Sequence, residues 1–178
     1  SPLGPILANI FLTYHEKNWL NNCDITIKPS LYRRYVDDCF LVFKNISHVA
    51  DFTTYLNQQH ANMKFTNEIE SDYKISFLGT LVHRNSSKMT TMVYRKPTFT
   101  GLYMNFYTCL PNCYKIGLIK TLLHRAYSIC SNYQLIHTEI LNIKNYLLLN
   151  SFNRQLIDNT VKHFLNRMCT SKINNQAT

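Results

Sequence analysis

Long apolar segments and secretory features are absent from this sequence. It contains no run of 18 apolar residues and no signal peptide, so nothing in it predicts a membrane-spanning helix. Its six cysteines show no spacing typical of a secreted disulfide framework. Cys109 and Cys113 are four residues apart, but no second pair at zinc-ligand spacing accompanies them, and ordinary thiols account for such a pair. We therefore expect free thiols, no zinc site and an intracellular, reducing location, although no targeting signal is present.

Acidic residues are also scarce: ten Asp and Glu stand against nineteen Lys and Arg, which gives a net charge of +9. Such an excess indicates a polyanionic partner, with nucleic acid as the first choice and an anionic membrane surface as the second. The excess is uneven, because residues 114–178 hold eight basic and two acidic residues and so carry +6. This last third is the predicted backbone-binding part of the chain.

One adjacent acidic pair, Asp37-Asp38, nevertheless stands at the centre of residues 31–43, LYRRYVDDCFLVF. Aromatic and β-branched residues flank the pair, which predicts two short strands joined by a tight turn at residues 36–39. Adjacent carboxylates stay ionised together only when a cation, a basic side chain or solvation neutralises them, and their oxygens suit Mg²⁺. The simplest alternative is a solvated turn, which Asp favours. At most one of Arg33 and Arg34 can face nucleic acid, because successive strand residues point to opposite sides, and we expect the other to be solvated.

The stretch Tyr35-Val36-Asp37-Asp38 resembles the active-site hairpin of reverse transcriptases. Three further stretches in matching order and spacing narrow the resemblance to the reverse transcriptases of Penelope-like retroelements: SPLGPILAN at residues 1–9, Phe77-Leu78-Gly79, and VYRKPT at residues 93–98. The similarity covers nearly the whole chain. Because the chain begins without Met inside what resembles a polymerase domain, we expect a fragment that comprises the palm from the Ser-Pro-Leu helix onward, plus the thumb.

The resemblance implies an RNA-directed DNA polymerase that uses two Mg²⁺ ions. It implies that Asp37 is a direct metal ligand and Asp38 a second, weaker or indirect one, since neighbours on a hairpin cannot easily face the same ion. The implied partners are an RNA template and a DNA primer rather than a membrane, the substrates are deoxynucleoside triphosphates, and the location is nuclear. Template and nucleotide binding is implied for Ser1, Pro2, Leu3, Gly4 and Tyr35. A primer grip, which holds the growing 3′ end over the carboxylates, is implied for Phe77, Leu78, Gly79, Tyr94, Arg95 and Lys96.

Two-metal catalysis needs a further aspartate from a different strand, which in reverse transcriptases lies upstream of the Ser-Pro-Leu helix. Asp24, Asp51 and Asp72 all lie downstream, in stretches typical of a loop, a helix and a turn, so none is a credible substitute. The fingers that clamp the incoming triphosphate are also missing. We therefore expect this polypeptide to be inactive by itself.

The predicted fold class is α+β: a partial polymerase palm, with an antiparallel sheet and helices on one face, followed by an all-α C-terminal thumb or helix-turn-helix-like bundle. Apolar spacing predicts a helix at residues 3–20, capped by Ser1 and packed in the core by its apolar stripe. A helix at 47–60 and strands at 63–70, 74–82 and 89–95 follow, the last two joined by a polar turn at 84–88. The predicted domains are the palm at 1–96, a connector at 97–113 and the thumb at 114–178.

Helical spacing of apolar residues predicts three helices in the last third, at 116–129, 136–147 and 156–165. The polar break Asn150-Ser151-Phe152-Asn153 separates the last two and allows a helical corner. Residues 149–165 resemble a helix-turn-helix-like piece of the family, which commonly has Gly-Tyr-Pro where this chain has Ser151-Phe152-Asn153. Three packed helices are also a common structural module, and only a minority read base sequence.

Three functions therefore compete. The first is the palm and thumb of a retroelement reverse transcriptase, and the second is a non-catalytic nucleic-acid-binding module that keeps the aspartates as a relic. The third is a structural or protein-interaction fold without a nucleic-acid role. An open reading frame that extends upstream with an aspartate-bearing strand favours the first over the second. Binding to primer-template that weakens steeply with salt excludes the third.

Overall fold

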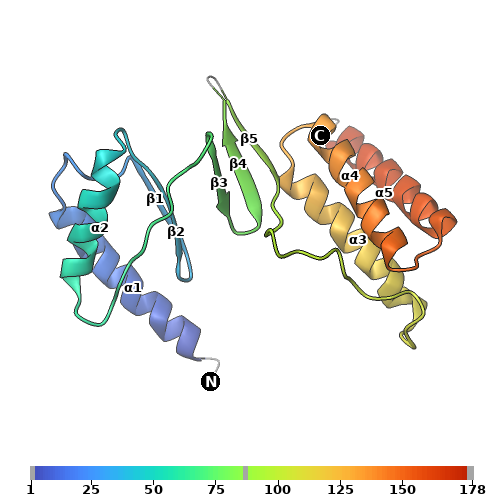
Figure 1. The fold of residues 1–178 in the computed structure, drawn as a ribbon, viewed down its shortest axis with the longest axis horizontal. Coiled ribbons are helices and arrows are strands. Elements are labelled where there is room, and N and C mark those ends of the chain that lie inside the picture. The colour runs from blue at the N-terminus through green and yellow to red at the C-terminus, as the bar shows by residue number, and fades with distance from the viewer. Residues whose placement is uncertain (1–2, 86–87, 176–178) are drawn as a thin grey trace. The chain divides into compact units, whose positions relative to one another are not determined.

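The structure, a computed structural model, describes residues 3–85 and 88–175. In chain order the elements are α1 (Leu3–Asn22), β1 (Leu31–Tyr35), β2 (Asp38–Val42), α2 (Ser47–Gln59), β3 (Lys74–Phe77), β4 (Thr80–Arg84), β5 (Met89–Val93), α3 (Asn112–Ile129), α4 (Tyr133–Leu149) and α5 (Arg154–Asn175) (Figure 1). The α+β class is confirmed, with the described strands divided between two antiparallel sheets, β1-β2 and β3-β4-β5.

The chain forms two compact units, residues 1–70 and residues 71–178. Compactness therefore groups β3 to β5 with the helices that follow them. The predicted boundaries at residues 97 and 114 divide the chain by function rather than by compactness, and they stay a prediction.

In the first unit, a β1-β2 hairpin packs against α1 and α2 around a small core. Tyr32 and Leu41 pair across the two strands, and both pack against this core. The buried members of the core are Trp19, Cys23, Phe52 and Leu56. A two-stranded sheet is marginally stable in water by itself, so the contacts with the two helices stabilise the hairpin.

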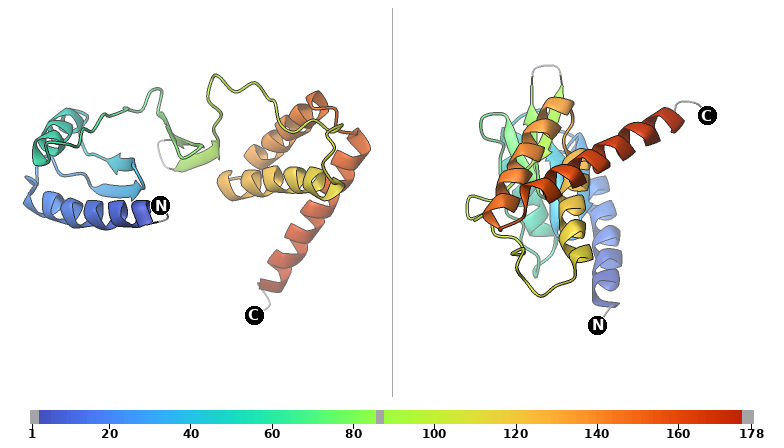
Figure 2. Two further views of the ribbon diagram at one scale, coloured as in Figure 1. Left: turned by 90° about the horizontal axis from the view of Figure 1, so that it is seen from below. Right: turned by 90° about the vertical axis from the view of Figure 1, so that its right-hand side faces the viewer.

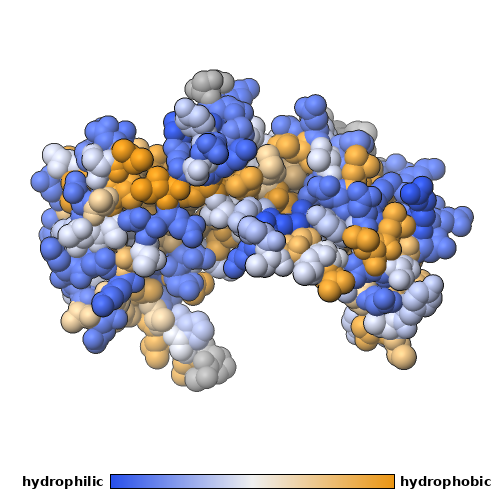
Figure 3. Space-filling model, in the orientation of Figure 1, coloured by the Kyte–Doolittle hydropathy of each residue, from blue (hydrophilic) through white to orange (hydrophobic). Residues whose placement is uncertain are grey.

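The predicted first helix extends to Asn22, but its predicted role in the core is wrong for most of its apolar stripe. Only Glu16 and Trp19 of α1 are buried. The side chains of the stripe are 43 to 66% exposed: Leu3, Ile6, Leu7, Ile10, Phe11 and Tyr14. Figure 3 shows some hydrophobic surface beside the N-terminal end of the chain. The predicted cap Ser1, and Pro2, lie outside the described residues.

The predicted strand at residues 63–70 is wrong, because this segment runs without a ladder partner among the described residues. The side chain of Asn57 on α2 takes the place of a neighbouring strand. Its Oδ1 accepts a hydrogen bond from the backbone N–H of Phe65 at 2.6 Å, and its Nδ2 donates to the Phe65 carbonyl at 3.1 Å. Both backbone groups of Phe65 are thus satisfied without a strand.

In the second unit, the predicted strand at residues 74–82 is two strands, β3 and β4, joined by the two-residue turn Leu78-Gly79. Phe77 pairs with Thr80 across this turn. Leu78 and Gly79 have φ angles of +48° and +73°, as the hairpin turn that matches strand twist requires. β5 then pairs with β4, and residues 86–87 of the predicted polar turn lie outside the described residues.

The three predicted C-terminal helices are confirmed and are longer than their apolar cores. They bury one shared cluster: Ile119, Leu122, Leu123, Ala126, Ile140, Ile143, Leu147, Phe152, Ile157, Val161 and Phe164. Each fully buried aliphatic or aromatic side chain of this kind contributes about 1.5–3 kcal/mol. The predicted corner at Asn150-Asn153 is present, and the C-terminal half of α5 extends beyond α3 and α4 (Figure 2).

The three-stranded sheet is fastened to the bundle through β5 and the residues that follow it. Thr91 Oγ1 donates to the Ile129 carbonyl at 2.5 Å, and the backbone of Thr91 exchanges hydrogen bonds with Ser131. Arg95 forms a bidentate ion pair with Glu139 on α4. Its guanidinium also lies over the ring of Tyr146, 4.9 Å from the ring centroid.

The irregular connector after β5 is pinned by one buried amide, Asn150, at the end of α4. Its Nδ2 donates to the Gly101 carbonyl at 2.8 Å, and its Oδ1 accepts from the N–H of Tyr103 at 2.9 Å. Gly101 has a φ of +77°, and a Cβ there would lie 2.9 Å from the Tyr146 ring. The connector is therefore irregular in conformation but fixed in place.

We expect Glu139→Gln to destabilise the second unit, because a neutral amide cannot balance the partly buried Arg95 guanidinium. Breaking a buried pair in this way costs about 3–5 kcal/mol, and these side chains are 17% and 8% exposed. Urea unfolding followed by far-UV circular dichroism measures the loss. In the control Asp158→Asn, the exposed Lys144–Asp158 pair is broken, which should cost under about 1 kcal/mol. Equal costs for the two variants would contradict the assignment.

Candidate catalytic hairpin and nucleic-acid interface

The two predicted metal ligands lie at the tip of the β1-β2 hairpin. Tyr35 pairs with Asp38, so the loop comprises only Val36 and Asp37 and is shorter than the predicted turn. Asp37 and Asp38 are exposed, and Tyr35 beside them is 61% exposed. Val36 has a φ of +56°, which a β-branched residue adopts only when its surroundings impose it. The tip is therefore a held conformation.

No residue that the structure describes donates a hydrogen bond or an ion pair to the carboxylate of Asp37 or Asp38. Two adjacent carboxylates without a basic partner fit a hydrated Mg²⁺ ion, which keeps several waters and takes one or two carboxylates. They do not make a complete protein cage, since the described residues contain no group of three or more His, Cys, Asp or Glu that could hold a metal. Two ligands are what this hairpin can supply.

The side chain of Arg34 connects the hairpin tip to α1. Its Nε donates to Glu16 Oε1 at 2.6 Å, its Nη1 donates to Asn9 Oδ1 and to the Val36 carbonyl at 3.0 Å each, and its Nη2 donates to Thr13 Oγ1 at 3.2 Å. The predicted alternation of the two arginines is correct, since Arg33 is exposed. Arg33 is the solvated one of the two, whereas Arg34 is bound to α1 and to the Val36 carbonyl at the tip.

Glu16 and Tyr32 extend this network into the hairpin. The Tyr32 hydroxyl donates to Glu16 Oε1 at 2.6 Å and lies 3.4 Å from Cys39 Sγ. Burial, reinforced by these two neighbours, raises the pKa of Tyr32, so the hydroxyl stays protonated and keeps donating. Burial also raises the pKa of the Cys39 thiol. Tyr32 and Cys39, the residue after Asp38 on β2, are therefore neutral, and the negative charge at the tip comes from the two aspartates.

The residues implied in template and nucleotide binding are only partly described. Ser1 and Pro2 lie outside the described residues, whereas Leu3 and Gly4 are exposed at the N-terminal end of α1. A Cβ at Gly4 would meet no atom within 4 Å. The structure brings the hairpin tip to the same helix, because Arg34 contacts Asn9 and Thr13 of α1.

The two segments implied in the primer grip are brought together in the second unit. The N–H of Tyr94 donates to the Gly79 carbonyl at 2.9 Å, so the chain after β5 lies beside the Leu78-Gly79 turn. Arg125 on α3, which the sequence analysis missed, donates to the same carbonyl at 3.2 Å. A Cβ at Gly79 would lie 2.7 Å from Arg125 Nη2. Glycine thus permits a close approach by a side chain.

The two basic residues implied in the primer grip, Arg95 and Lys96, differ in whether their side chains are available to contact nucleic acid. Arg95 is bound to Glu139, and this hydrogen bonding raises the pKa of Arg95. Lys96 next to it is exposed. Lys96 and the half-buried Tyr94 are therefore the members of this segment that can reach nucleic acid without breaking an internal pair.

The helical bundle presents a basic surface, as the charge distribution predicts. The exposed basic residues whose side chains the structure describes on α3 to α5 are Lys120, Arg125, Arg154, Lys162 and Arg167. Glu139 is buried in an ion pair with Arg95, so Asp158 is the only acidic side chain exposed on the described parts of these helices. The surface therefore offers several phosphate contacts and little repulsion.

Comparison with known proteins finds one matching family model. Residues 102–162, about a third of the chain, match the animal helix-turn-helix domain. The matched segment contains the second half of the connector, α3, α4, the corner and the first turns of α5. No curated protein and no solved structure matches the chain. The helix-turn-helix-like character predicted for the bundle is thereby confirmed.

Across the described parts of the chain, none of the helices has both the length and the apolarity that crossing a bilayer requires.

Arg34→Ala should loosen the β1-β2 hairpin, because it leaves the Glu16 carboxylate nearly buried without its ionic partner. We expect the free energy of unfolding of the first unit to fall by about 3 kcal/mol. Trp19, the single tryptophan of the chain, lies in the core of this unit, so its fluorescence reports the transition. Arg33→Ala is the matched control, since that side chain is exposed and should leave the midpoint unchanged. If Arg33→Ala were the more damaging of the two, the network would not hold the hairpin.

Proposed function

We propose that this protein binds nucleic acid through its C-terminal helical bundle. The observation that carries the proposal is the coincidence of the helix-turn-helix match at residues 102–162 with a three-helix bundle whose exposed side chains are mainly basic. Helix-turn-helix modules commonly place a helix against nucleic acid. The +6 net charge of residues 114–178 supports the same assignment.

We further propose that the chain belongs to the palm and thumb of a reverse transcriptase of a Penelope-like retroelement. Three features support this proposal. The Tyr35-Asp38 stretch forms a held hairpin tip with two exposed, unneutralised carboxylates. Phe77-Gly79 and Tyr94, which are far apart in the sequence, are adjacent in the fold. The matched helical domain follows them in the order that the resemblance implies.

In this proposal the residues divide the work of nucleotide addition. Asp37 and Asp38 hold the metal ions, and Mg²⁺ supplies charge neutralisation at the attacking 3′ hydroxyl and the leaving pyrophosphate. Tyr94 and Lys96, beside the Leu78-Gly79 turn, contact the primer end and orient it. The bundle holds the duplex by its phosphates, which is positioning rather than chemistry.

Nucleotide addition also needs a third carboxylate that this polypeptide does not supply. Asp24 lies in a turn after α1, Asp51 on α2 and Asp72 in the turn before β3. None of them lies on a strand beside the hairpin. We therefore propose that these 178 residues do not incorporate nucleotides by themselves.

A non-catalytic nucleic-acid-binding module remains the second candidate, and the helix-turn-helix match supports it equally. The two candidates share the binding function of the bundle and differ in the use of the hairpin. Metal binding at the hairpin therefore separates them, and salt-dependent binding tests what they have in common.

The bundle should bind an RNA–DNA primer-template with an affinity that falls steeply with salt. Each phosphate contact contributes about 0.9 to the slope of log K against log salt, so five exposed cations predict a slope between about −2 and −5. Fluorescence anisotropy with a labelled 20-base-pair hybrid measures it. Lys162→Glu with Arg167→Glu should weaken binding at least about tenfold. The control Lys17→Glu with Lys28→Glu makes the same charge change at exposed positions of the first unit and should weaken it far less. Absent or salt-independent binding would support a structural role instead.

Mn²⁺, as a paramagnetic substitute for Mg²⁺, should broaden the backbone amide NMR signals of residues 35–39 selectively. Asp37→Asn with Asp38→Asn should abolish this broadening, because amides bind divalent ions more weakly than carboxylates. Asp51→Asn, which removes an exposed carboxylate from α2, is the control and should leave the effect intact. Equal broadening at every exposed acidic residue would identify the pair as an ordinary solvated turn.

A further inference from the structure

A pocket of about 240 Å³ lies at the open end of the β1-β2 hairpin, opposite the tip that carries the aspartates. The loop that leads into β1 and the loop that follows β2 form its walls. Lys28, Lys44 and His48 line it, and none of the described residues in its lining is acidic. These three side chains make no hydrogen bond or ion pair with any residue that the structure describes. The pocket therefore gathers two ammonium groups and an imidazole, without a carboxylate among them.

The two loops are held by hydrogen bonds of their own. Asp24 Oδ1 accepts from the N–H and from the hydroxyl of Thr26 at 2.9 Å each, and the Asp24 carbonyl accepts from the Lys28 N–H at 3.1 Å. The N–H and the hydroxyl of Ser30 both donate to the Val42 carbonyl, at 2.8 and 2.9 Å. This contact places the first loop beside the end of β2. The pocket is therefore preformed, and the carboxylate nearest to it in sequence already has donors within its own loop.

The charges in the pocket match a phosphate monoester better than a carboxylate. Such a phosphate carries a charge of about −1.5 to −2 at pH 7 and has three acceptor oxygens, which suits two ammonium groups and a third basic side chain. α2 begins at Ser47, beside the pocket, and no side chain caps its first turn, so the positive end of its dipole adds to the same field. The hydroxyls of Thr26 and Ser30 already donate within the fold. The three basic side chains are therefore the donors that a ligand would meet.

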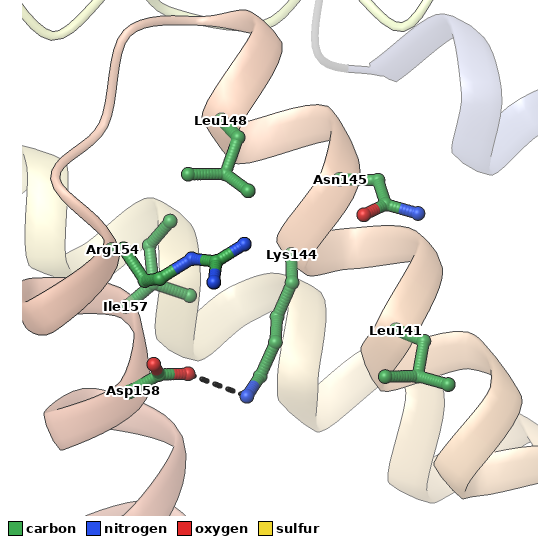
Figure 4. A pocket seen from close by; sticks show the side chains of 7 residues that line it. All are labelled: Leu141, Lys144, Asn145, Leu148, Arg154, Ile157 and Asp158. Carbon is green, nitrogen blue, oxygen red and sulfur yellow. Dashed lines mark hydrogen bonds and ion pairs between the residues drawn. The ribbon is translucent and has the colours of Figure 1, made fainter.

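The cleft between α4 and α5 in the second unit shows how a similar group of cations is balanced internally (Figure 4). Its basic side chains are Lys144 and Arg154, and Lys144 Nζ lies 2.5 Å from Asp158 Oδ1. The lysine of that cleft thus has an anionic partner within the fold. The pocket of the first unit has a similar volume and no such partner in its described lining, which makes it the better candidate for an external anion.

Exposed apolar side chains flank the pocket, and the unit around it is not basic. Ile25, which lines the pocket, is 86% exposed, and Ile46, between Lys44 and His48 in the sequence, is 72% exposed. Protein interfaces combine apolar and polar contacts, whereas nucleic-acid interfaces are more polar and strongly positive. Residues 1–70 contain six basic and seven acidic residues, a net charge of −1, so this unit does not attract a polyanion over a distance. These surroundings favour one phosphate group on a partly apolar partner.

We propose that this pocket binds a phosphorylated serine or threonine side chain of a partner protein. Lys28 and Lys44 pair with the phosphate oxygens, and His48 donates a third hydrogen bond. Apolar side chains next to the phosphorylated residue contact Ile25 and Ile46. The site is separate from the basic surface of the bundle, so it adds a protein partner to the proposed function and does not depend on nucleic-acid binding.

The phosphate site is tested by titrating the full chain with the peptide acetyl-Val-phosphoserine-Val-amide and recording the NMR signals of the backbone amides. Signals of residues 26–30 and 44–48 should shift, because the phosphate binds between these loops, and the unphosphorylated peptide should shift them far less. Lys28→Ala and Lys44→Ala should each weaken binding at least about fivefold, since each removes one charged partner of the phosphate. Lys64→Ala, the matched control, removes an exposed lysine elsewhere in the same unit and should leave the affinity unchanged.

The apolar flanks separate a protein partner from other carriers of phosphate. Ile25→Ser with Ile46→Ser should weaken binding of the phosphorylated peptide at least about threefold, and it should leave the weaker binding of inorganic phosphate unchanged. Vesicles of phosphatidylcholine and phosphatidylserine should not displace the peptide from the pocket. A 12-nucleotide DNA strand without terminal phosphates should not displace it either. Circular dichroism verifies that each variant is folded.

The outcomes also separate this inference from the proposed function. If the pocket signals do not shift, if both peptides shift them equally, or if Lys64→Ala weakens binding as much as Lys28→Ala does, the pocket is not a phosphate site. Displacement by vesicles or by DNA would assign it to a membrane or to nucleic acid and overturn the protein partner, as would unchanged peptide affinity in the double isoleucine variant. None of these results alters the salt-dependent binding of primer-template by the bundle, which tests the proposed function alone.

Discussion

A partly buried arginine–glutamate pair fastens a small sheet to a helix in each of the two units. Arg34 and Glu16 join β1 to α1, and Arg95 and Glu139 join the end of β5 to α4. A two-stranded sheet is marginal by itself, and a small three-stranded sheet needs a packed apolar face, so the turns that the two sheets carry depend on these attachments. Buried ion pairs add little net stability compared with apolar packing. We interpret their role here as orientation, since in each case the guanidinium makes a further contact that positions its neighbours, the Val36 carbonyl in one unit and the Tyr146 ring in the other.

Because of these ion pairs, the basic residues of the chain are of two kinds, which the amino-acid sequence alone does not distinguish. Arg34 and Arg95 are structural, because a glutamate holds each of them. Arg154, Lys162 and Arg167 are exposed on α5 and remain available for phosphate contacts. Residues 114–178 contain two acidic residues, and one of them, Glu139, is removed from solvent by its ion pair with Arg95. The net charge of this segment alone does not show how few acidic groups its surface exposes. A polyanion approaching the bundle meets cations and amides, with Asp158 as the exception.

Much of the fold followed from periodicity, and the errors occurred where periodicity carries no information. Apolar spacing located α3, α4 and α5, and flanking apolar runs located the hairpin that carries Asp37. The same spacing showed that α1 is amphipathic, but it cannot show what covers an apolar stripe. Residues 63–70 alternate as a strand does, yet a side chain of α2 satisfies the backbone of Phe65. The turn at Leu78-Gly79 escaped notice because leucine is not a usual signal for a positive φ.

The candidate sites show a similar division. The position of Asp37 and Asp38 at a hairpin tip was readable from local sequence, whereas the partners of Arg34 and Arg95 lie 18 and 44 residues away and were not. The corner before α5 adds one more consequence. Ser151 adopts a φ of +67° where the resembling family commonly has glycine, while Asn150 and the buried Phe152 hold the chain on either side. The bend is thus dictated by its neighbours, which hold Ser151 in a backbone conformation that residues other than glycine adopt only at a conformational cost.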